Sequence, residues 1–349
     1  MSTVDTFAPA GERRPADARS TPEAVADAAP TPISVARPET RDDEALHRLI
    51  FIGLAVALAA APFVLYPVFL MKVLCFALFA CAFNLLLGYG GLLSFGHAAY
   101  FGAASYVSAY TAKTWGLTPE LAILLGTLTA AALGALFGSL AIRRQGIYFA
   151  MITLALAQMV FFFSLQAPFT GGEDGIQAVP RGHLFGLVSL ADDRTLYWLV
   201  AAIFLLGLLL IYRIIHSPFG QVLKAIRDNE PRAISLGYRA SQYKLAVFVL
   251  SATLAGLAGA TKAIVFQLAS LTDVHWTMSG EVVLMTLVGG MGTVFGPIAG
   301  AAVIVAMQNY LAQFGSWVLV IQGVIFVVCV LLFREGIVGV LGRWIKRPL

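Results

Sequence analysis

The sequence carries little charge for its length. Asp, Glu, Lys and Arg together make up 12% of the 349 residues, whereas hydrophobic residues make up 59%. The surface of a soluble globular domain must be solvated, so such a domain carries about 25% charged residues. A chain with half of that charge places most of its surface against lipid or other apolar protein. The composition therefore predicts an integral membrane protein.

Cysteine is also scarce. The three cysteines, Cys75, Cys81 and Cys329, lie inside apolar runs and have no paired spacing. An odd count without paired spacing argues against a disulfide framework and against a zinc site. These side chains are expected to be small buried hydrophobes.

Several functional motifs are absent from the sequence. No Gly-x-x-x-x-Gly-Lys-Ser/Thr string occurs, so the chain is not expected to hold nucleotide phosphates itself. No His-Glu-x-x-His string suggests a metal site, and no basic stripe with interleaved aromatics suggests a nucleic-acid partner. Acidic pairs at mid-membrane, which would indicate ion coupling, are absent too. We expect a chain without metal or cofactor that is not an enzyme.

Long apolar runs dominate what is present. A helix needs about 20 apolar residues to cross the hydrocarbon core. Nine runs are candidate spans: 49–66, 68–87, 92–112, 119–141, 146–166, 195–214, 242–267, 296–313 and 317–333. A tenth, 280–291, is short and interrupted by Gly289 and Gly290. The sequence thus predicts an all-α polytopic membrane helical bundle with about ten transmembrane segments, nine clear and one short and broken.

Lys and Arg residues predict the orientation of these spans. They gather at Arg143–Arg144, in the 213–244 connection and near the C-terminus. The positive-inside rule places all three on the cytoplasmic side. The number of crossings between residues 244 and 334 must then be even, which requires the short 280–291 segment to cross. Both termini are expected in the cytoplasm and the 167–194 loop outside.

The chain divides into three parts. Residues 1–46 are rich in Ala, Pro, Thr and charge, and they precede the first apolar run. They do not resemble a signal peptide and predict a disordered cytoplasmic tail. Residues 47–335 form the predicted transmembrane domain, and residues 336–349 form a basic cytoplasmic tail.

Two glycine-interrupted stretches predict a central pathway. Gly88–His97 precedes the third span, and Gly289–Pro297 precedes the span at 296–313. Irregular backbone at membrane depth is tolerated where protein or a water-filled path satisfies it, and broken segments often mark a transport pathway. Tight helix packing is the alternative explanation of these glycines. The pathway or gate candidates here are Gly90, Gly91, Ser94, His97, Gly289 and Gly290.

Individual polar residues near the spans allow two interpretations. His97 is either a gate residue or a histidine bonded to a helix carbonyl. Lys72 and Lys262 lie near span ends, where extension of the side chain towards the interface explains them. The predicted external loop holds further gate candidates, Gly171, Gly172, Asp174 and Gly175. Its glycines permit positive φ and Asp174 suits a turn, so plain turn chemistry also explains it.

Residues 217–237 predict two short amphipathic helices between the sixth and seventh spans. Ser217 is suited to cap a helix that starts at Pro218. Glu230 is expected to end that helix and cap the next one at Pro231, and Gly237 to terminate the second. One face carries Val222, Leu223 and Ile226, and the opposite face carries Gln221, Lys224, Arg227 and Asp228. A docking surface and a helix lying on the membrane both fit this pattern.

The chain resembles the permeases of bacterial ATP-binding-cassette importers for branched-chain amino acids, above all the larger of the two permease subunits. The resemblance covers most of residues 50–335. Five strings carry it in family order: Asn84–His97, Tyr148–Ala155, Thr170–Ile176, Arg227–Gly237 and Leu287–Thr293. Urea and short-amide permeases share the glycine strings and stay open as an alternative. An ion-coupled carrier is a more distant one.

The resemblance implies a set of partners. These are a second, homologous permease subunit, two cytoplasmic ATPase subunits that use ATP and Mg²⁺, and a periplasmic substrate-binding protein, assembled in the inner membrane. It also implies that residues 217–237 couple to the ATPases. Val222, Leu223 and Ile226 would supply buried area there, and Lys224, Arg227 and Glu230 would set the orientation.

The match to the general permease motif of Glu-Ala-Ala followed by Gly is partial. Glu230, Ala233 and Gly237 match it in type. Pro231-Arg232 replaces the adjoining alanines, and the glycine lies one residue further along.

Overall fold

The computed structural model describes residues 41–186, 188–311, 317, 320–321, 323–324, 327 and 336–339. For residues 41–48 it describes the backbone alone. Most of the predicted N-terminal tail, of the 317–333 span and of the basic C-terminal tail lies outside the described residues.

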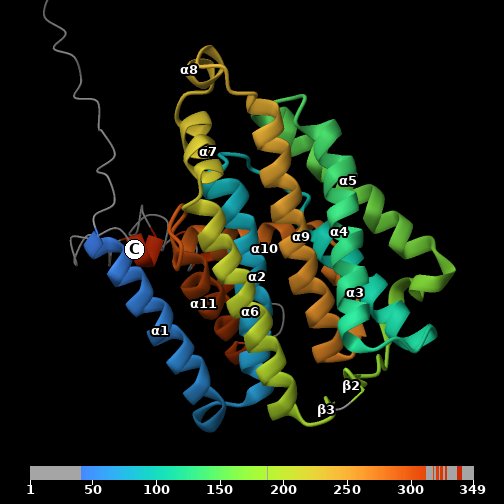
Figure 1. The fold of residues 1–349 in the computed structure, drawn as a ribbon. Helices are drawn as coiled ribbons and strands as arrows, with labels where there is room; N and C mark the ends of the chain where they lie inside the picture. Colours follow the sequence, from blue (N-terminus) through green and yellow to red (C-terminus); the bar gives the residue numbers. More distant parts are fainter. Residues whose placement is uncertain are drawn as a thin grey trace, which may run out of the picture.

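The described chain is mostly helical (Figure 1). Its longer helices are α1 (Arg41–Val64), α2 (Pro67–Asn84), α3 (His97–Thr114), α4 (Pro119–Ala141), α5 (Ile147–Gln166), α6 (Asp193–Ile215) and α9 (Ala240–Phe266). The shorter ones are α7 (Pro218–Asp228), α8 (Glu230–Ser235), α10 (Trp276–Gly289) and α11 (Gly296–Tyr310). A π-helical turn, η1 (Leu85–Tyr89), extends α2.

Five of these helices are long and apolar enough to cross a membrane. They are α2 with η1, α4, α5, α6 and α9. A helix rises about 1.5 Å per residue, so α10 and α11, with 14 and 15 residues, are shorter than a full crossing. The structure is therefore that of a helical membrane protein, and the predicted ten segments exceed the five spans identified by length and composition.

Short strands and turns gather at one end of the bundle. β1 (Ile176–Gln177) pairs antiparallel with β4 (Leu268–Ala269), and β2 (His183–Leu184) pairs with β3 (Val188–Ser189). Three 3₁₀ turns accompany them: η2 (Pro168–Thr170), η3 (Gly172–Asp174) and η4 (Leu271–Asp273). Helices α7 and α8 lie at the other end (Figure 1). We refer to these as the opposite end and the α7–α8 end.

Small residues let the central helices approach closely. Helix α9 packs against α2, α3 and α4. Gly256 of α9 faces Ala130 of α4, and a Cβ added to Gly256 would lie 2.1 Å from the Ala130 Cβ. Gly126 of α4 likewise lies against the backbone carbonyl of Ala104 in α3. Apolar lipid gives no hydrophobic drive for helix association, so close van der Waals packing holds these helices together.

Three helix starts differ from the predicted ones. Helix α1 begins at Arg41, so residues 41–46 belong to it and not to the predicted tail. Helix α3 begins at His97, five residues after the start of the predicted span 92–112, because residues 90–96 are irregular. Helix α10 begins at Trp276, where the His275 side chain accepts a hydrogen bond from the Thr277 amide.

Candidate functional site

The caps of α7 and α8 follow from local sequence. Ser217 Oγ accepts from the Gly220 N–H at 3.3 Å, as predicted. The prediction that Glu230 caps α8 is wrong, because Asn229 Oδ1 accepts from the Arg232 N–H at 3.0 Å. Asn is a far better N-cap than Glu, and its extended backbone already separates the two helices. Glu230 becomes the first residue of α8.

Glu230 holds α8 to the rest of the bundle. Its carboxylate forms an ion pair with Lys244 Nζ of α9 at 2.7 Å. The same side chain accepts from Gln145 Nε2 at 3.0 Å. The basic connection after α4, at Arg143–Arg144, is therefore at the same end of the bundle as α7 and α8.

The apolar face of α7 is turned inward. Leu223 and Ile226 are 1% and 2% exposed, and Val222 is half-buried beside Ile226. Helix α7 packs on η1, α6 and α9, which cover this face. Leu223 and Ile226 are already buried within their own chain, so they offer little free area to a partner, whereas Val222 stays partly accessible. The coupling role of this face stays a prediction.

Helix α8 instead presents an exposed apolar patch. Ile234, Leu236 and Tyr238, here called the α8 patch, are 54%, 70% and 40% exposed. Gly237 terminates the helix as predicted, with φ of +90°. Its N–H donates to Ile234 O, and the Tyr238 N–H donates to Ala233 O, which completes a Schellman motif. The motif leaves the α8 patch exposed at the end of the helix. In the sequence, the patch is indicated by the apolar residues on both sides of Gly237.

Arg227 joins α7 to the first glycine-rich loop. Its Nη1 donates to the Gly88 carbonyl oxygen at 2.5 Å, and its Nε donates to Asp228. The Arg227 stem covers Gly91, where an added Cβ would lie 2.8 Å from Arg227 Cγ. Lys224 Nζ lies 5.7 Å from the centre of the Tyr89 ring. The sequence separated coupling residues from pathway residues, and the structure places the two sets in contact.

The two glycine-rich loops also contact each other. Asn84 Nδ2 donates to Thr293 O at 2.8 Å, and the Gly292 N–H donates to Asn84 Oδ1 at 2.9 Å. A Cβ on Gly88 would lie 2.7 Å from the Gly292 nitrogen. We call Asn84, Gly88, Gly292 and Thr293 the glycine junction. Sequence reasoning missed Asn84, whose signal is a polar residue at the end of an apolar span.

Most of the predicted pathway residues near these loops are enclosed. Ser94 and His97 are fully buried, and Gly90, Gly289 and Gly290 are buried as well, whereas Gly91 is exposed. The Thr153 hydroxyl accepts from the Phe95 N–H, which satisfies irregular backbone inside the bundle. None of the buried residues lines an open path in this conformation, and their role in transport stays a prediction.

His97 holds three helices together. Its Nε2 lies 2.9 Å from Ser251 Oγ of α9, and the Ser251 hydroxyl donates to Ala82 O of α2. Since the serine proton is used on Ala82, Nε2 of His97 is the donor. The rings of Phe83, Tyr100 and Phe248 surround the imidazole edge-on. His97 thus bonds to a hydroxyl that in turn bonds to a helix carbonyl. This is close to the interpretation of His97 as a histidine bonded to a helix carbonyl.

At the opposite end, the predicted turn glycines adopt the expected backbone. Gly171, Gly172 and Gly175 have φ of 78°, 59° and 66°. Gly175 passes close to Ala269 of β4, because β1, which begins at the next residue, pairs with β4. Asp174 is exposed in this loop.

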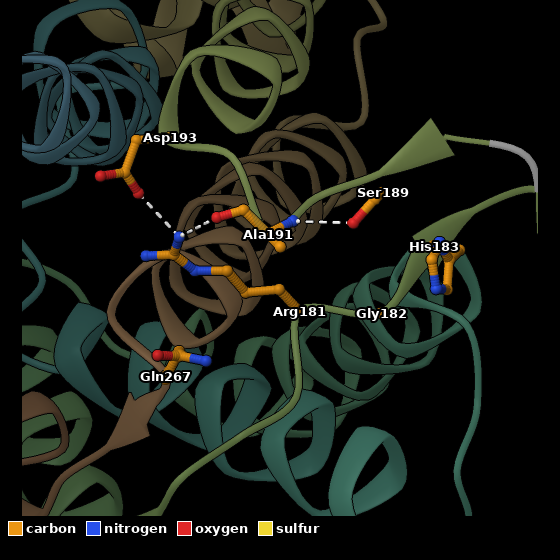
Figure 2. Close-up of a pocket in the computed structure, with 7 residues that line it drawn as sticks. All are labelled: Arg181, Gly182, His183, Ser189, Ala191, Asp193 and Gln267. Carbon is orange, nitrogen blue, oxygen red and sulfur yellow. Dashed lines mark hydrogen bonds and ion pairs between the residues drawn. The ribbon is translucent and has the colours of Figure 1, made fainter.

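A polar cavity lies beside this loop (Figure 2). Its volume is about 570 Å³, and its lining includes Arg181, His183, Asp193 and Gln267. Arg181 donates to Asp193 at 2.7 Å, to Ala191 O at 3.3 Å and to Val265 O at 3.1 Å. Arg181 therefore fixes the loop between α5 and α6 to the ends of α6 and α9. No motif or pattern in the sequence singles out Arg181.

Lys262 was expected to extend its side chain to the membrane–water interface. Instead it forms a buried ion pair. Its Nζ lies 2.6 Å from Asp273 Oδ2, and the two side chains are 10% and 3% exposed. Among the described residues, no group of three or more His, Cys, Asp or Glu side chains is placed to hold a metal ion.

Comparisons with known proteins agree with this architecture. The family model for the permease component of branched-chain amino acid transport systems matches residues 66–330. The chain is 28% identical to the high-affinity branched-chain amino acid transport system permease proteins LivM of Salmonella typhimurium and Escherichia coli. Each match covers 72% of this chain and 63% of the relative, so the chain spans less than two thirds of those relatives.

A more distant relative imports a different solute. The ribose import permease protein RbsC of Bacillus subtilis is 27% identical over 63% of this chain and 70% of its own length. No solved structure matches the chain. The family match covers most of the described helices and both glycine-rich loops. The chain belongs to the family of permease components of branched-chain amino acid transport systems.

Proposed function

We propose that this chain is a membrane-spanning subunit of an ATP-driven importer of branched-chain amino acids in the bacterial inner membrane. Family membership and the printed role of the two LivM relatives support this substrate class. ATP and Mg²⁺ would be used by separate ATPase subunits. A second permease completes the pathway, and a periplasmic binding protein delivers the substrate.

One geometric observation carries the coupling mechanism. Helix α7 is fixed to the first glycine-rich loop through Arg227 and Gly88. Gly88 packs closely on Gly292 of the second loop, which Asn84 at the end of α2 also holds. An ATPase that docks on the α8 patch and moves these helices would displace the loops that precede α3 and α11. Arg227 and Glu230 orient the pair through Gly88 and Lys244, and Ala233 and Gly237 shape the patch.

We propose ten crossings with both termini in the cytoplasm. The Arg143–Arg144 loop shares an end with α7 and α8, which agrees with one basic, cytoplasmic side. Tyr310 lies at the opposite end, where its ring is 6.2 Å from Phe69 near the start of α2. Gly336 lies against Gly290, near the α7–α8 end. The chain between residues 310 and 336 would therefore cross back.

The opposite end would then face the periplasm. The Gly171–Gly175 loop, with its exposed Asp174, is a candidate contact for the binding protein or for closing the pathway. Residues 41–46 are helical, so the N-terminal cytoplasmic tail would end at residue 40. The 336–349 segment would form the second cytoplasmic tail.

Transport by the reconstituted complex tests this proposal. The chain would be purified with its partner permease and ATPases, placed in liposomes with the binding protein, and supplied with labelled leucine, urea or ribose. We expect leucine uptake that requires ATP. ATP-dependent uptake of urea or ribose alone would contradict the substrate class, and leucine uptake that persists without the ATPases would contradict the transport mechanism.

A further inference from the structure

Four charged side chains lie within the helices at the opposite end of the bundle. They are Lys72 of α2, Lys262 of α9, Asp273 of η4 and Glu281 of α10. Lys72 and Glu281 each lie one to two turns after the first residue of their helix. Ionisable residues inside membrane segments are costly and commonly mark a substrate or ion pathway. This group therefore requires an explanation beyond helix packing.

Two of the four charges form a close ion pair and two do not. Lys262 and Asp273 form a buried ion pair at 2.6 Å, and Asp273 also accepts from the Ser270 N–H. Lys72, which is half-buried, interacts electrostatically with Glu281 and Lys262 but makes no hydrogen bond or close ion pair among the described residues. Glu281 accepts one hydrogen bond, from Gln308 Nε2 at 3.0 Å. Lys72 and Glu281 thus keep unused donor and acceptor capacity.

Buried hydroxyls without partners lie on the neighbouring helix. Within the described part of the chain, Ser105 Oγ and Tyr106 OH of α3 are buried and have no hydrogen-bond partner. Tyr106 is 4% exposed and interacts electrostatically with Asp273. Buried polar groups are normally hydrogen-bonded, so these two hydroxyls keep polar capacity beside the charged group.

An apolar surface adjoins the charges. Phe69 lies one helical turn before Lys72 on α2, and Tyr310 lies two residues after Gln308 on α11. Their ring centroids are 6.2 Å apart. Residues three apart on a helix share a face, so the aromatic pair and the Lys72 ammonium border the same region.

We propose that Lys72 and Glu281 form an entry site for a free zwitterionic amino acid. The Lys72 ammonium binds the substrate carboxylate, and the Glu281 carboxylate binds the substrate ammonium. Phe69 and Tyr310 contact the apolar side chain, while the Lys262–Asp273 pair keeps the surroundings electrically neutral. Urea and ribose carry neither charge, so this site would select against both. The assignment rests on the proposed function and names the residues that bind its substrate.

Ligand binding to the complete transporter tests the site. The purified complex of permeases and ATPases, without the binding protein, is titrated with tritiated leucine in a scintillation proximity assay. Competition with leucinamide, which lacks the carboxylate, and with 4-methylpentanoate, which lacks the ammonium, reports each charge separately. The variants are Lys72→Gln and Glu281→Gln. Arg194→Gln is the control, because Arg194 is an exposed cation at the same end.

Each variant has a distinct expected result. Lys72→Gln raises the Kd for leucine about tenfold or more and leaves competition by leucinamide unchanged, since a charge-assisted hydrogen bond is lost. Glu281→Gln also raises the Kd for leucine and leaves competition by 4-methylpentanoate unchanged. Arg194→Gln binds all three ligands like the wild type. Unchanged leucine binding, or an equal loss for all three ligands, overturns the proposal.

Two further measurements separate the possible failures. If a glutamine variant does not assemble, Lys72→Met or Glu281→Met replaces it, because each also removes the charge. A wild-type Kd for leucine in that variant then overturns the site. ATP-dependent uptake by the wild-type complex is measured in parallel. If the wild-type complex takes up leucine but the variants bind leucine like the wild type, only the entry site is refuted. If the wild-type complex takes up no leucine, the proposed function is refuted as well.

Discussion

Asn84 is a single side chain that satisfies two backbone groups of a distant loop. It is 3% exposed and bonds to Gly292 and Thr293, more than 200 residues away. We expect Asn84→Ala to lower the free energy of unfolding by about 1–3 kcal/mol, because both backbone groups lose their partner. Thermal unfolding of the purified protein measures this. Thr127→Ala is the control, since Thr127 only bonds a carbonyl of its own helix.

The Lys262–Asp273 pair predicts a second effect of one residue. Asp273→Asn leaves the Lys262 ammonium buried without its counter-charge, and such a loss costs about 3–5 kcal/mol. A lower melting temperature is expected. Lys262→Met combined with Asp273→Asn should recover part of the loss, because no unpaired charge is left. A double variant less stable than Asp273→Asn would contradict this account.

At the residue scale, sequence predicted what depends on neighbours along the chain. Ser217 and Gly237 act through contacts within five residues, and both predictions are confirmed. Arg227 was predicted to orient a partner, but its bond to Gly88 spans 139 residues and follows only from tertiary packing. Arg181 and Asn84 were missed for the same reason.

Among the elements, α8 makes the clearest prediction about assembly. Leu236 is 70% exposed at the centre of the α8 patch. We expect Leu236→Glu to weaken co-purification of the ATPase subunits at least tenfold, because it places a charge in the proposed apolar contact. Gln221→Glu adds the same charge to the exposed side of α7 and should retain the ATPases. If both variants retain the ATPase subunits equally, the ATPases do not dock on the α8 patch.

Close packing of α4 and α9 predicts a steric effect. Gly256→Ala forces the added methyl group against Ala130 and should cost about 1–3 kcal/mol of stability. The compensating change Ala130→Gly should restore the melting temperature. Gly280→Ala meets no atom within 4 Å and should leave stability equal or slightly higher. Identical melting of the Gly256 and Gly280 variants would argue against this interface.

Helical elements were predictable because composition and length determine them. The predicted spans at 119–141, 146–166, 195–214 and 242–267 match α4, α5, α6 and α9 closely. The partner of the apolar α7 face was not predictable, since amphipathicity shows that a face will be covered and not what covers it. Here the chain's own bundle covers it, and the exposed area moves to α8.

For the whole molecule, the arrangement of basic loops predicts sidedness. In a background without Cys75, Cys81 and Cys329, we expect Arg144→Cys to react with impermeant maleimide only in inverted vesicles. Glu173→Cys, in the exposed turn at the opposite end, should react in intact spheroplasts. Both results follow from basic residues on the cytoplasmic side. Labelling of both variants from one side would contradict the proposed topology.

The contact between the two glycine-rich loops limits how this subunit is able to move. Helices α3 and α11 start directly after loops that pack on each other at Gly88 and Gly292, and Asn84 of α2 holds the second loop in place. Neither helix start is therefore expected to shift alone while these contacts persist. Opening at this end would therefore be concerted, with two segments displaced in one step. Under the proposed function, each cycle of the ATPases would then drive one joint displacement of both helix starts.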